Sequence, residues 1–161
     1  MKLEKAIFAC GCFWGAQYQF EHAKGVVRST VGYIGGHKEH PAYEEVKAHT
    51  TGHAEATLVE FDAEQTSFTE LCKLFFEIHD PAQTNGQGPD IGPQYRSEIF
   101  YLNDKQKEEA EAVIALLREK GYEVNTKLTP ATTFWEGEEY HQHYYDKTGG
   151  EPYCHIRIKK F

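Results

Sequence analysis

The sequence lacks a long apolar run. Near the N-terminus only the five residues 6–10 are apolar in succession. A membrane-spanning helix needs about 20 apolar residues, and the core of a signal peptide needs at least about 7. We therefore predict neither a membrane segment nor a secretory leader, and we expect a cytoplasmic protein.

Positive charge is also scarce. Lys and Arg number 17 against 25 Asp and Glu, which gives a formal net charge of −8. An acidic chain repels a polyphosphate, so we expect no nucleic-acid partner. The 161 residues contain no internal repeat, low-complexity tract or linker. This length suits one domain with its own core, so we predict a single domain over residues 1–161 and expect a monomer.

Cysteine is limited to four residues, and no Cys-x-x-Cys pair occurs among them: Cys10, Cys12, Cys72 and Cys154. In a reducing compartment such residues stay as thiols unless they are catalytic or bind a metal. One alternative is a zinc site, whose ligands would come from Cys10, Cys12, His53, His141 and His143. The missing pair and the scattered histidines argue against it, so we expect no metal and no other bound cofactor.

Hydrophobic periodicity predicts an α+β fold. We expect strands at residues 5–10, 26–34, 53–61, 94–102 and 122–128, and helices at 13–23, 68–79, 104–120 and near 138–146. Residues 43–47 fit either a short helix or a turn. Ser67 and Asp104 are the expected caps of two helices. Residues 80–93 form a long loop rich in Gly and Pro, a type that is often functional. The result would be a mixed or antiparallel sheet with packed helices and a long irregular C-terminal segment, residues 132–161.

Cys12 lies where the first predicted strand turns into the first predicted helix. The N–H groups of a helix start carry partial positive charge, which should lower the pKa of the thiol and favour the nucleophilic thiolate. Gly11 and Gly15 would leave room for a substrate to approach, and Phe13 and Trp14 suggest a pocket for a small apolar group. The alternative is that Cys12 is only a small buried hydrophobe.

Glu55 lies on a predicted apolar strand between Ala54 and Ala56. A buried carboxylate is costly unless it has partners or a function. The strand pattern alone fits a solvent-facing glutamate better, because Glu is almost never fully buried unless it is paired.

Seven blocks of the sequence resemble, in the same order, blocks of the peptide methionine sulfoxide reductase A family: residues 11–15 (GCFWG), 32–36 (GYIGG), 43–46 (YEEV), 51–55 (TGHAE), 79–83 (HDPAQ), 94–97 (QYRS) and 140–142 (YHQ). The resemblance runs from residue 6 to about residue 155. It implies a ferredoxin-like core and reduction of methionine-S-sulfoxide, free or in proteins, with thioredoxin as the external reductant instead of a bound cofactor.

The resemblance also implies roles for individual residues. Cys12 would be the nucleophile, Glu55 the proton donor, and Tyr43 and Tyr95 hydrogen-bond donors to the sulfoxide oxygen. The pocket would be lined by Asp90, Phe13 and Trp14, the last two holding the substrate's methyl group.

Cys154, near the C-terminus, would resolve the sulfenic acid formed on Cys12. Cys10 and Cys72 are expected to be buried packing, although either remains an alternative resolving thiol. Two other functions use similar residues. A binding module would not need the nucleophile, and a cysteine peptidase would need a histidine partner that the pattern does not supply.

Overall fold

The computed structural model describes residues 1–150, 152 and 155–161. Its elements in chain order are β1 (Leu3–Cys10), α1 (Phe13–Glu21), β2 (Val26–Ile34), α2 (Tyr43–Lys47), β3 (Ala54–Asp62), α3 (Phe68–Glu77), β4 (Gly86–Gln87), β5 (Asp90–Ile91), η1 (Pro93–Tyr95), β6 (Ser97–Tyr101), α4 (Asp104–Glu119), β7 (Lys127–Pro130), β8 (Trp135–Glu136), η2 (Glu139–His141) and α5 (Tyr144–Thr148). The elements η1 and η2 are 3-10 turns.

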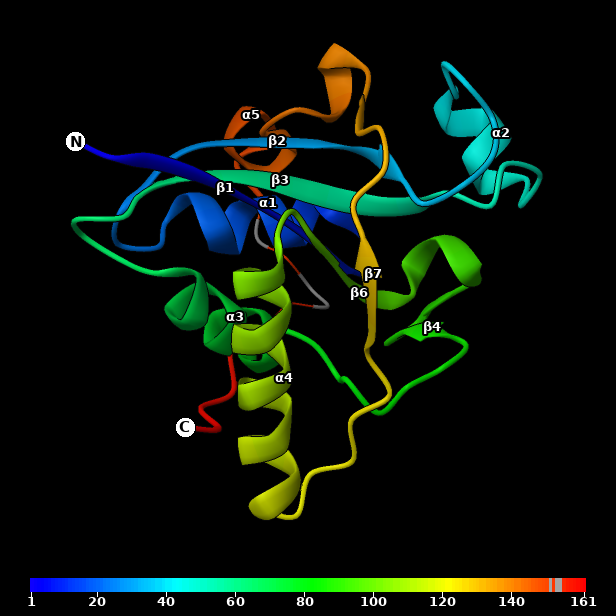
Figure 1. Cartoon of the computed structure of the whole chain (residues 1–161). Coiled ribbons are helices and arrows are strands. Elements are labelled where there is room, and N and C mark those ends of the chain that lie inside the picture. Colours follow the sequence, from blue (N-terminus) through cyan, green and yellow to red (C-terminus); the bar gives the residue numbers. More distant parts are fainter. Residues whose placement is uncertain (151, 153–154) are drawn as a thin grey trace.

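Six of the strands form one sheet in the order β7-β6-β1-β3-β2-β8 (Figure 1). The four central strands pair antiparallel with one another, β8 adds to β2 in antiparallel, and β7 adds to β6 in parallel. The chain passes through β1, α1, β2, β3, α3 and β6, so each of the two helices connects strands that are not adjacent. The structure confirms the predicted α+β class and the mixed sheet.

Strand β1 is buried on both faces. Ala6 and Phe8 point into the larger core with α1, α3 and α4, while Ile7 and Ala9 point into a second core on the opposite face. Successive side chains of a strand alternate between faces, which explains the division. The ring of Phe8 stacks on rings of both helices, with centroid distances of 5.0 Å to Phe20 of α1 and 5.3 Å to Phe75 of α3. These contacts fix α1, and with it the Cys12 turn, against the sheet.

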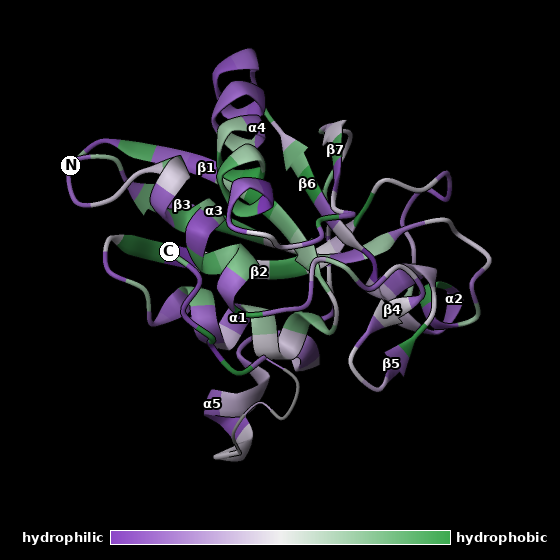
Figure 2. Cartoon of the chain, turned by 90° about the horizontal axis from the view of Figure 1, so that it is seen from below, coloured by the Kyte–Doolittle hydropathy of each residue, from purple (hydrophilic) through white to green (hydrophobic). Residues whose placement is uncertain are grey.

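Hydropathy follows this layering. Figure 2 shows green, apolar strands in the interior and purple, polar residues along much of α4. The second core is closed by Ala131 and Phe134, which lie outside the helices. No helix among the described residues is long and apolar enough to cross a membrane.

The long helices begin at side-chain caps. The Ser67 hydroxyl accepts the Glu70 N–H at 3.1 Å, which confirms the predicted cap of α3. The predicted cap of α4 was wrong by one residue. Asn103, not Asp104, caps that helix, and its side-chain oxygen accepts the Gln106 N–H at 2.9 Å.

The strand predicted at residues 122–128 was wrong in position. β7 begins only at Lys127, where it pairs with β6. The preceding backbone is used elsewhere, since the Tyr122 N–H bonds to Leu117 O at the end of α4 and the Asn125 N–H bonds to Pro81 O. A backbone that is already paired with a loop cannot also pair along a strand.

Three other boundaries also differ from prediction. The loop at residues 80–93 contains the hairpin β4–β5, and residues 93–95 form η1 ahead of a shorter β6. The single helix predicted near 138–146 is split into η2 and α5. His143 lies between them with a left-handed φ of 53°, and that backbone conformation interrupts a right-handed helix.

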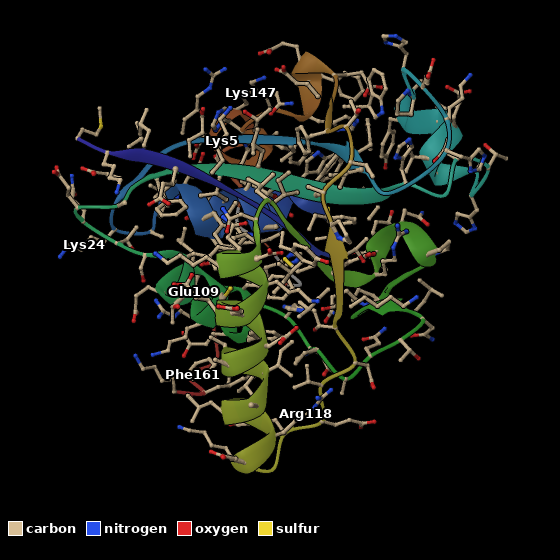
Figure 3. All side chains as sticks on the ribbon, in the orientation of Figure 1. Lys5, Lys24, Glu109, Arg118, Lys147 and Phe161 are labelled. Carbon is tan, nitrogen blue, oxygen red and sulfur yellow. The ribbon has the colours of Figure 1, made fainter. Side chains whose placement is uncertain are left out.

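The C-terminal segment folds back onto α3. The Ile158 N–H bonds to Glu77 O at 2.7 Å, and Arg157 pairs with the Glu77 carboxylate at 2.8 Å. Phe161 packs on the larger core beside α4 (Figure 3). These contacts fix the end of the chain against α3 and the larger core.

Candidate active site

Cys12 occupies the N-cap position of α1, one residue after β1 ends at Cys10 and Gly11 turns the chain. This confirms the predicted strand-to-helix placement. The Cys12 side chain is only 9% exposed. A thiol at this position faces the unpaired N–H groups of the first helical turn, which favour negative charge.

The two glycines that flank Cys12 do not make room for a substrate, and that prediction was wrong. A Cβ at Gly11 would lie 2.7 Å from the Cβ of Gln87, and a Cβ at Gly15 would clash with His155 Nδ1. Both gaps are therefore filled by the protein itself. Gly11 also has a φ of +97°, which side-chain-bearing residues rarely adopt.

Glu55 is buried, with 2% exposure, although the strand pattern alone favoured a solvent-facing residue. It lies on β3, and its carboxyl accepts the N–H of Phe13, the residue after Cys12, at 3.2 Å. Burial raises the pKa of Glu55 to about 8, with a further rise from the Asp90 charge and an opposing effect of the Phe13 hydrogen bond. At neutral pH the group is mainly a protonated acid held at the start of the Cys12 helix.

Tyr43 and Tyr95 share this environment. Burial is the main cause that raises the pKa of both phenols, to about 12 for Tyr43, and the charge of Glu55 is the next cause for each. Cys12 also raises the pKa of both, and Asp90 raises that of Tyr95. The structure therefore brings five of the predicted residues into one site: Cys12, Tyr43, Glu55, Asp90 and Tyr95. Both tyrosines stay protonated at neutral pH and can act as hydrogen-bond donors.

Phe13 and Trp14 differ in how they are held. Phe13 is 1% exposed, and its ring lies among aromatic rings, 5.7 Å from Tyr33 and 6.5 Å from Tyr43 between centroids. Trp14 is half-buried, and its indole stacks on Tyr144 at 3.8 Å between centroids. Phe13 thus belongs to the packed wall, whereas part of Trp14 remains accessible to a ligand.

His141 is a component of the site for which the sequence suggested only a metal-ligand role. It is fully buried, and its Nδ1 accepts the Trp14 Nε1–H at 2.9 Å. Burial lowers the pKa of His141, so the ring is neutral and its Nε2 carries the proton. Among the described residues no partner hydrogen-bonds that Nε2. The ring lies 4.4 Å from that of Tyr43, so His141 connects Trp14 to the tyrosine side of the site.

The polypeptide around η2 also positions the site through two further side chains. The Glu138 carboxylate accepts the Tyr43 N–H at 3.0 Å and the Tyr33 hydroxyl at 2.8 Å. The Gln142 amide bonds to both the N–H and the carbonyl of Val31 in β2. These contacts join the C-terminal third of the chain to β2, which carries Tyr33, and to α2, which carries Tyr43.

Cys154, the predicted resolving cysteine, lies outside the described residues. The next residue, His155, is fully buried. Its Nε2 donates to Cys10 O at 2.7 Å, and its carbonyl accepts from Gln19 Nε2 at 2.6 Å. The chain directly after Cys154 is therefore anchored two residues from the candidate nucleophile. Cys10 and Cys72 are both buried in the larger core, as predicted.

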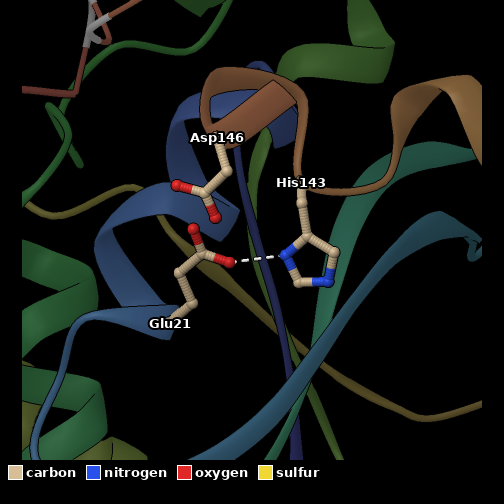
Figure 4. A group of neighbouring side chains, drawn as sticks. All are labelled: Glu21, His143 and Asp146. Carbon is tan, nitrogen blue, oxygen red and sulfur yellow. Dashed lines mark hydrogen bonds and ion pairs between the residues drawn. The ribbon is translucent and has the colours of Figure 1, made fainter. Parts of the chain in front are cut away.

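Within residues 1–150, 152 and 155–161, one group could hold a metal ion: Glu21, His143 and Asp146 (Figure 4). Of the ligands considered from the sequence, this group includes only His143. A Glu21 carboxylate oxygen lies 2.5 Å from His143 Nδ1, and the contact joins α1 to the segment that leads into α5. The group lies partly at the surface. Its contacts hold α5 against α1, which explains the cluster without a metal ion.

Comparison with known proteins identifies the relatives of this chain. A family model described as peptide methionine sulfoxide reductase matches residues 4–161. A peptide methionine sulfoxide reductase MsrA from Geobacter sulfurreducens is 48% identical over 151 residues, which cover 92% of this chain and 93% of the relative.

Two solved structures share the fold. Mxr1 from Saccharomyces cerevisiae in reduced form is 35% identical, with a TM-score of 0.89 over 97% of this chain and 92% of that one. Mxr1 in complex with Trx2 superimposes with a TM-score of 0.64 at 23% identity, over 99% and 91% of the two chains.

Replacing His141 by Leu should free the Trp14 indole, because it removes the acceptor for Nε1–H. In a Trp135→Phe background, where Trp14 is the remaining tryptophan, we expect a shifted emission maximum. Loss of a buried hydrogen bond should lower the free energy of unfolding by about 1–3 kcal/mol. His141→Asn is the matched control, since its side-chain oxygen can replace Nδ1 as acceptor. Identical emission spectra for the Leu variant and the parent would contradict the role of this bond.

Proposed function

The chain belongs to the peptide methionine sulfoxide reductase family, and from this we propose that Cys12, Glu55, Tyr43, Tyr95 and Cys154 carry out its reaction. The enzyme is an oxidoreductase that acts on methionine sulfoxide. One observation supports the assignment of the site above all others. The Glu55 carboxyl, which stays protonated near neutral pH, accepts a hydrogen bond from the N–H of Phe13, the residue after Cys12.

The first step transfers oxygen from the substrate to the enzyme. The Cys12 thiolate attacks the sulfur of methionine-S-sulfoxide, and the Glu55 carboxyl gives its proton to the sulfoxide oxygen. A carboxyl can donate in this way only while it is protonated, and the raised pKa of Glu55 keeps it so below about pH 8. The sulfur–sulfur bond made by the attack and the methionine S–O bond then break as the protonated oxygen bonds to the Cys12 sulfur. Methionine leaves, and Cys12 holds the oxygen as a sulfenic acid.

Tyr43 and Tyr95 support this step by hydrogen bonding. Negative charge grows on the sulfoxide oxygen as the thiolate attacks, and two neutral phenols can donate to it without bringing a charge of their own. The Asp90 charge helps to keep Glu55 protonated. Trp14, held by His141 and Tyr144, offers an apolar face for the substrate's methyl group.

The second step restores the thiol. Cys154 attacks the sulfenic sulfur of Cys12, water leaves, and a disulfide joins the two residues. Two thiols of an external reductant then reduce this disulfide. We propose thioredoxin for this role, which the solved complex of the yeast protein Mxr1 with Trx2 supports. Recycling of this kind requires a reducing compartment, so we place the enzyme in the cytoplasm.

We extend the proposal to the architecture. The order β6-β1-β3-β2, with α1 and α3 as connections, matches the β-α-β-β-α-β plan of the ferredoxin-like group. We propose that residues 1–161 act as one such domain in a monomer, on both free and protein-bound sulfoxide.

Replacing Cys12 by Ser should abolish methionine production, because a serine hydroxyl is a far weaker nucleophile than a thiolate. Methionine formed from the S-sulfoxide with dithiothreitol as reductant measures this by chromatography. Cys72→Ala is the matched control, since that thiol is buried in the core and should leave turnover intact. Turnover by Cys12→Ser above the rate without enzyme would exclude Cys12 as the nucleophile.

Replacing Cys154 by Ser should leave about one equivalent of methionine per enzyme in a single turnover without reductant. Cycling with thioredoxin should then stop, because no disulfide forms for it to reduce. Mass spectrometry of the oxidised parent should identify a bond between Cys12 and Cys154. A bond that includes Cys10 or Cys72 instead, with cycling retained in Cys154→Ser, would assign the resolving role to one of them.

Replacing Glu55 by Gln should slow the single-turnover step by about 10²–10⁴-fold at pH 7, the range that general acid catalysis contributes. In the parent, the rate should fall as the pH rises through about 8, because Glu55 then loses the proton it must donate. The Gln variant has no such group, so this alkaline decline should disappear. An unchanged decline in the variant would assign it to a different residue.

A further inference from the structure

The end of the chain exposes two apolar side chains to solvent. Ile156 is 68% exposed and Ile158 is 64% exposed. The residues that alternate with them face the protein, since His155 is fully buried and Arg157 pairs with the buried Glu77. The segment is held in place while both isoleucines point outward. Exposed apolar surface that is fixed in this way is a common sign of an interaction site.

These isoleucines line a groove of about 590 Å³, whose other apolar lining residues are Ile78, Pro81, Ala82 and Tyr122. We call this surface the tail groove. Gln87, the side chain that fills the space beside Gly11, also lines the groove. The tail groove therefore borders the turn that carries Cys12, on the side closed by Gln87 and His155.

The sequence places this groove beside the proposed recycling cysteine. Ile156 and Ile158 follow Cys154 by two and four residues, which is at most about 7 and 14 Å of extended chain. Transient redox complexes cover up to about 600 Å² on each side, equivalent to a disc of about 14 Å radius. A protein that brings a thiol to the sulfur of Cys154 therefore has Ile156 within its contact area and Ile158 near the edge of that area.

We propose that the tail groove is the docking surface for the dithiol protein that reduces the Cys12–Cys154 disulfide. The proposal rests on the proposed function and assigns thioredoxin a place on this chain. The partner would present an apolar surface around its reactive thiol. Burying the two isoleucines would supply affinity, and the charged side chains of Asp80, Glu123 and Lys160 also line the groove.

The chemistry requires contact at this place. One thiolate of the partner attacks the Cys154 sulfur, and Cys12 leaves as a thiolate. The partner's second thiol then attacks its own sulfur in the mixed disulfide and releases Cys154. The partner ends as a disulfide, and the enzyme regains two thiols. The partner attacks Cys154 rather than Cys12, because Cys12 is only 9% exposed and a thiol on another protein could not easily reach it.

The test is the double variant Ile156→Ser/Ile158→Ser, assayed as the full-length enzyme. With thioredoxin, its reductase and NADPH, we expect kcat/KM for thioredoxin to fall about tenfold or more, the size expected when two interface anchors are truncated. Turnover with dithiothreitol and the single-turnover yield of methionine should stay unchanged, because neither requires the groove.

Two further variants serve as controls. Ile156→Leu/Ile158→Leu keeps the apolar surface and should retain the parent value with thioredoxin. Leu3→Ser removes a 53% exposed apolar side chain at the start of β1 and should have no effect on any of the rates.

Unchanged kcat/KM for thioredoxin in the double Ser variant would overturn the proposal. So would a raised KM for an oxidised peptide, which would make the groove a substrate site, or a change in molar mass by light scattering, which would make it a self-association surface. Failure of the proposed function is seen separately, as absence of single-turnover methionine from the parent enzyme.

Discussion

The site depends on the contact between the Glu55 carboxyl and the N–H of Phe13 at 3.2 Å. Two effects oppose each other there. The hydrogen bond from a helix N-terminus favours the carboxylate and contributes about 1.5–3 kcal/mol at most. Taking a carboxylate out of water costs several kcal/mol, and Glu55 is 2% exposed. Burial therefore prevails, and the pKa of Glu55 rises to about 8. The contact connects β3 to the start of α1 and keeps an acid beside the thiol.

The remainder of the site is built around that contact by distant parts of the chain. Gln87 and His155 close one side of the Cys12 turn, where glycine allows their close approach. On the aromatic side, Glu138 holds the backbone of Tyr43 and His141 holds the indole of Trp14. The C-terminal third thus fixes residues that the N-terminal half supplies. This arrangement explains how an irregular segment can determine the geometry of the site.

Features that depend on neighbouring residues in the sequence were mostly predicted correctly. The apolar run of β1, the turn at Gly11 and the capped α3 were all found from sequence, and with them the position of Cys12. The burial of Glu55 could not be found this way, since a glutamate between two alanines fits either face of a strand. The filling of the Gly15 gap by His155 and the bond from Trp14 to His141 both join residues more than 120 positions apart. Only the folded chain shows such pairs. The strand predicted at 122–128 was wrong for the same reason, because its backbone pairs with a distant loop.

The anchoring of the tail suggests why a shielded nucleophile can still be recycled. A Cys12 open enough to meet a protein reductant would also be open to water and to other thiols, and its sulfenic acid would be exposed to further oxidation. Passing the oxidation to a cysteine on a second segment removes that conflict. The second segment must then stay close to Cys12 and also offer a surface to the reductant. The residues after Cys154 meet both requirements because they alternate in direction. His155 and Arg157 bind the rest of the protein, while Ile156 and Ile158 face outward. On our proposal, substrate and reductant therefore meet different surfaces of one small fold, connected by the exchange between two sulfur atoms.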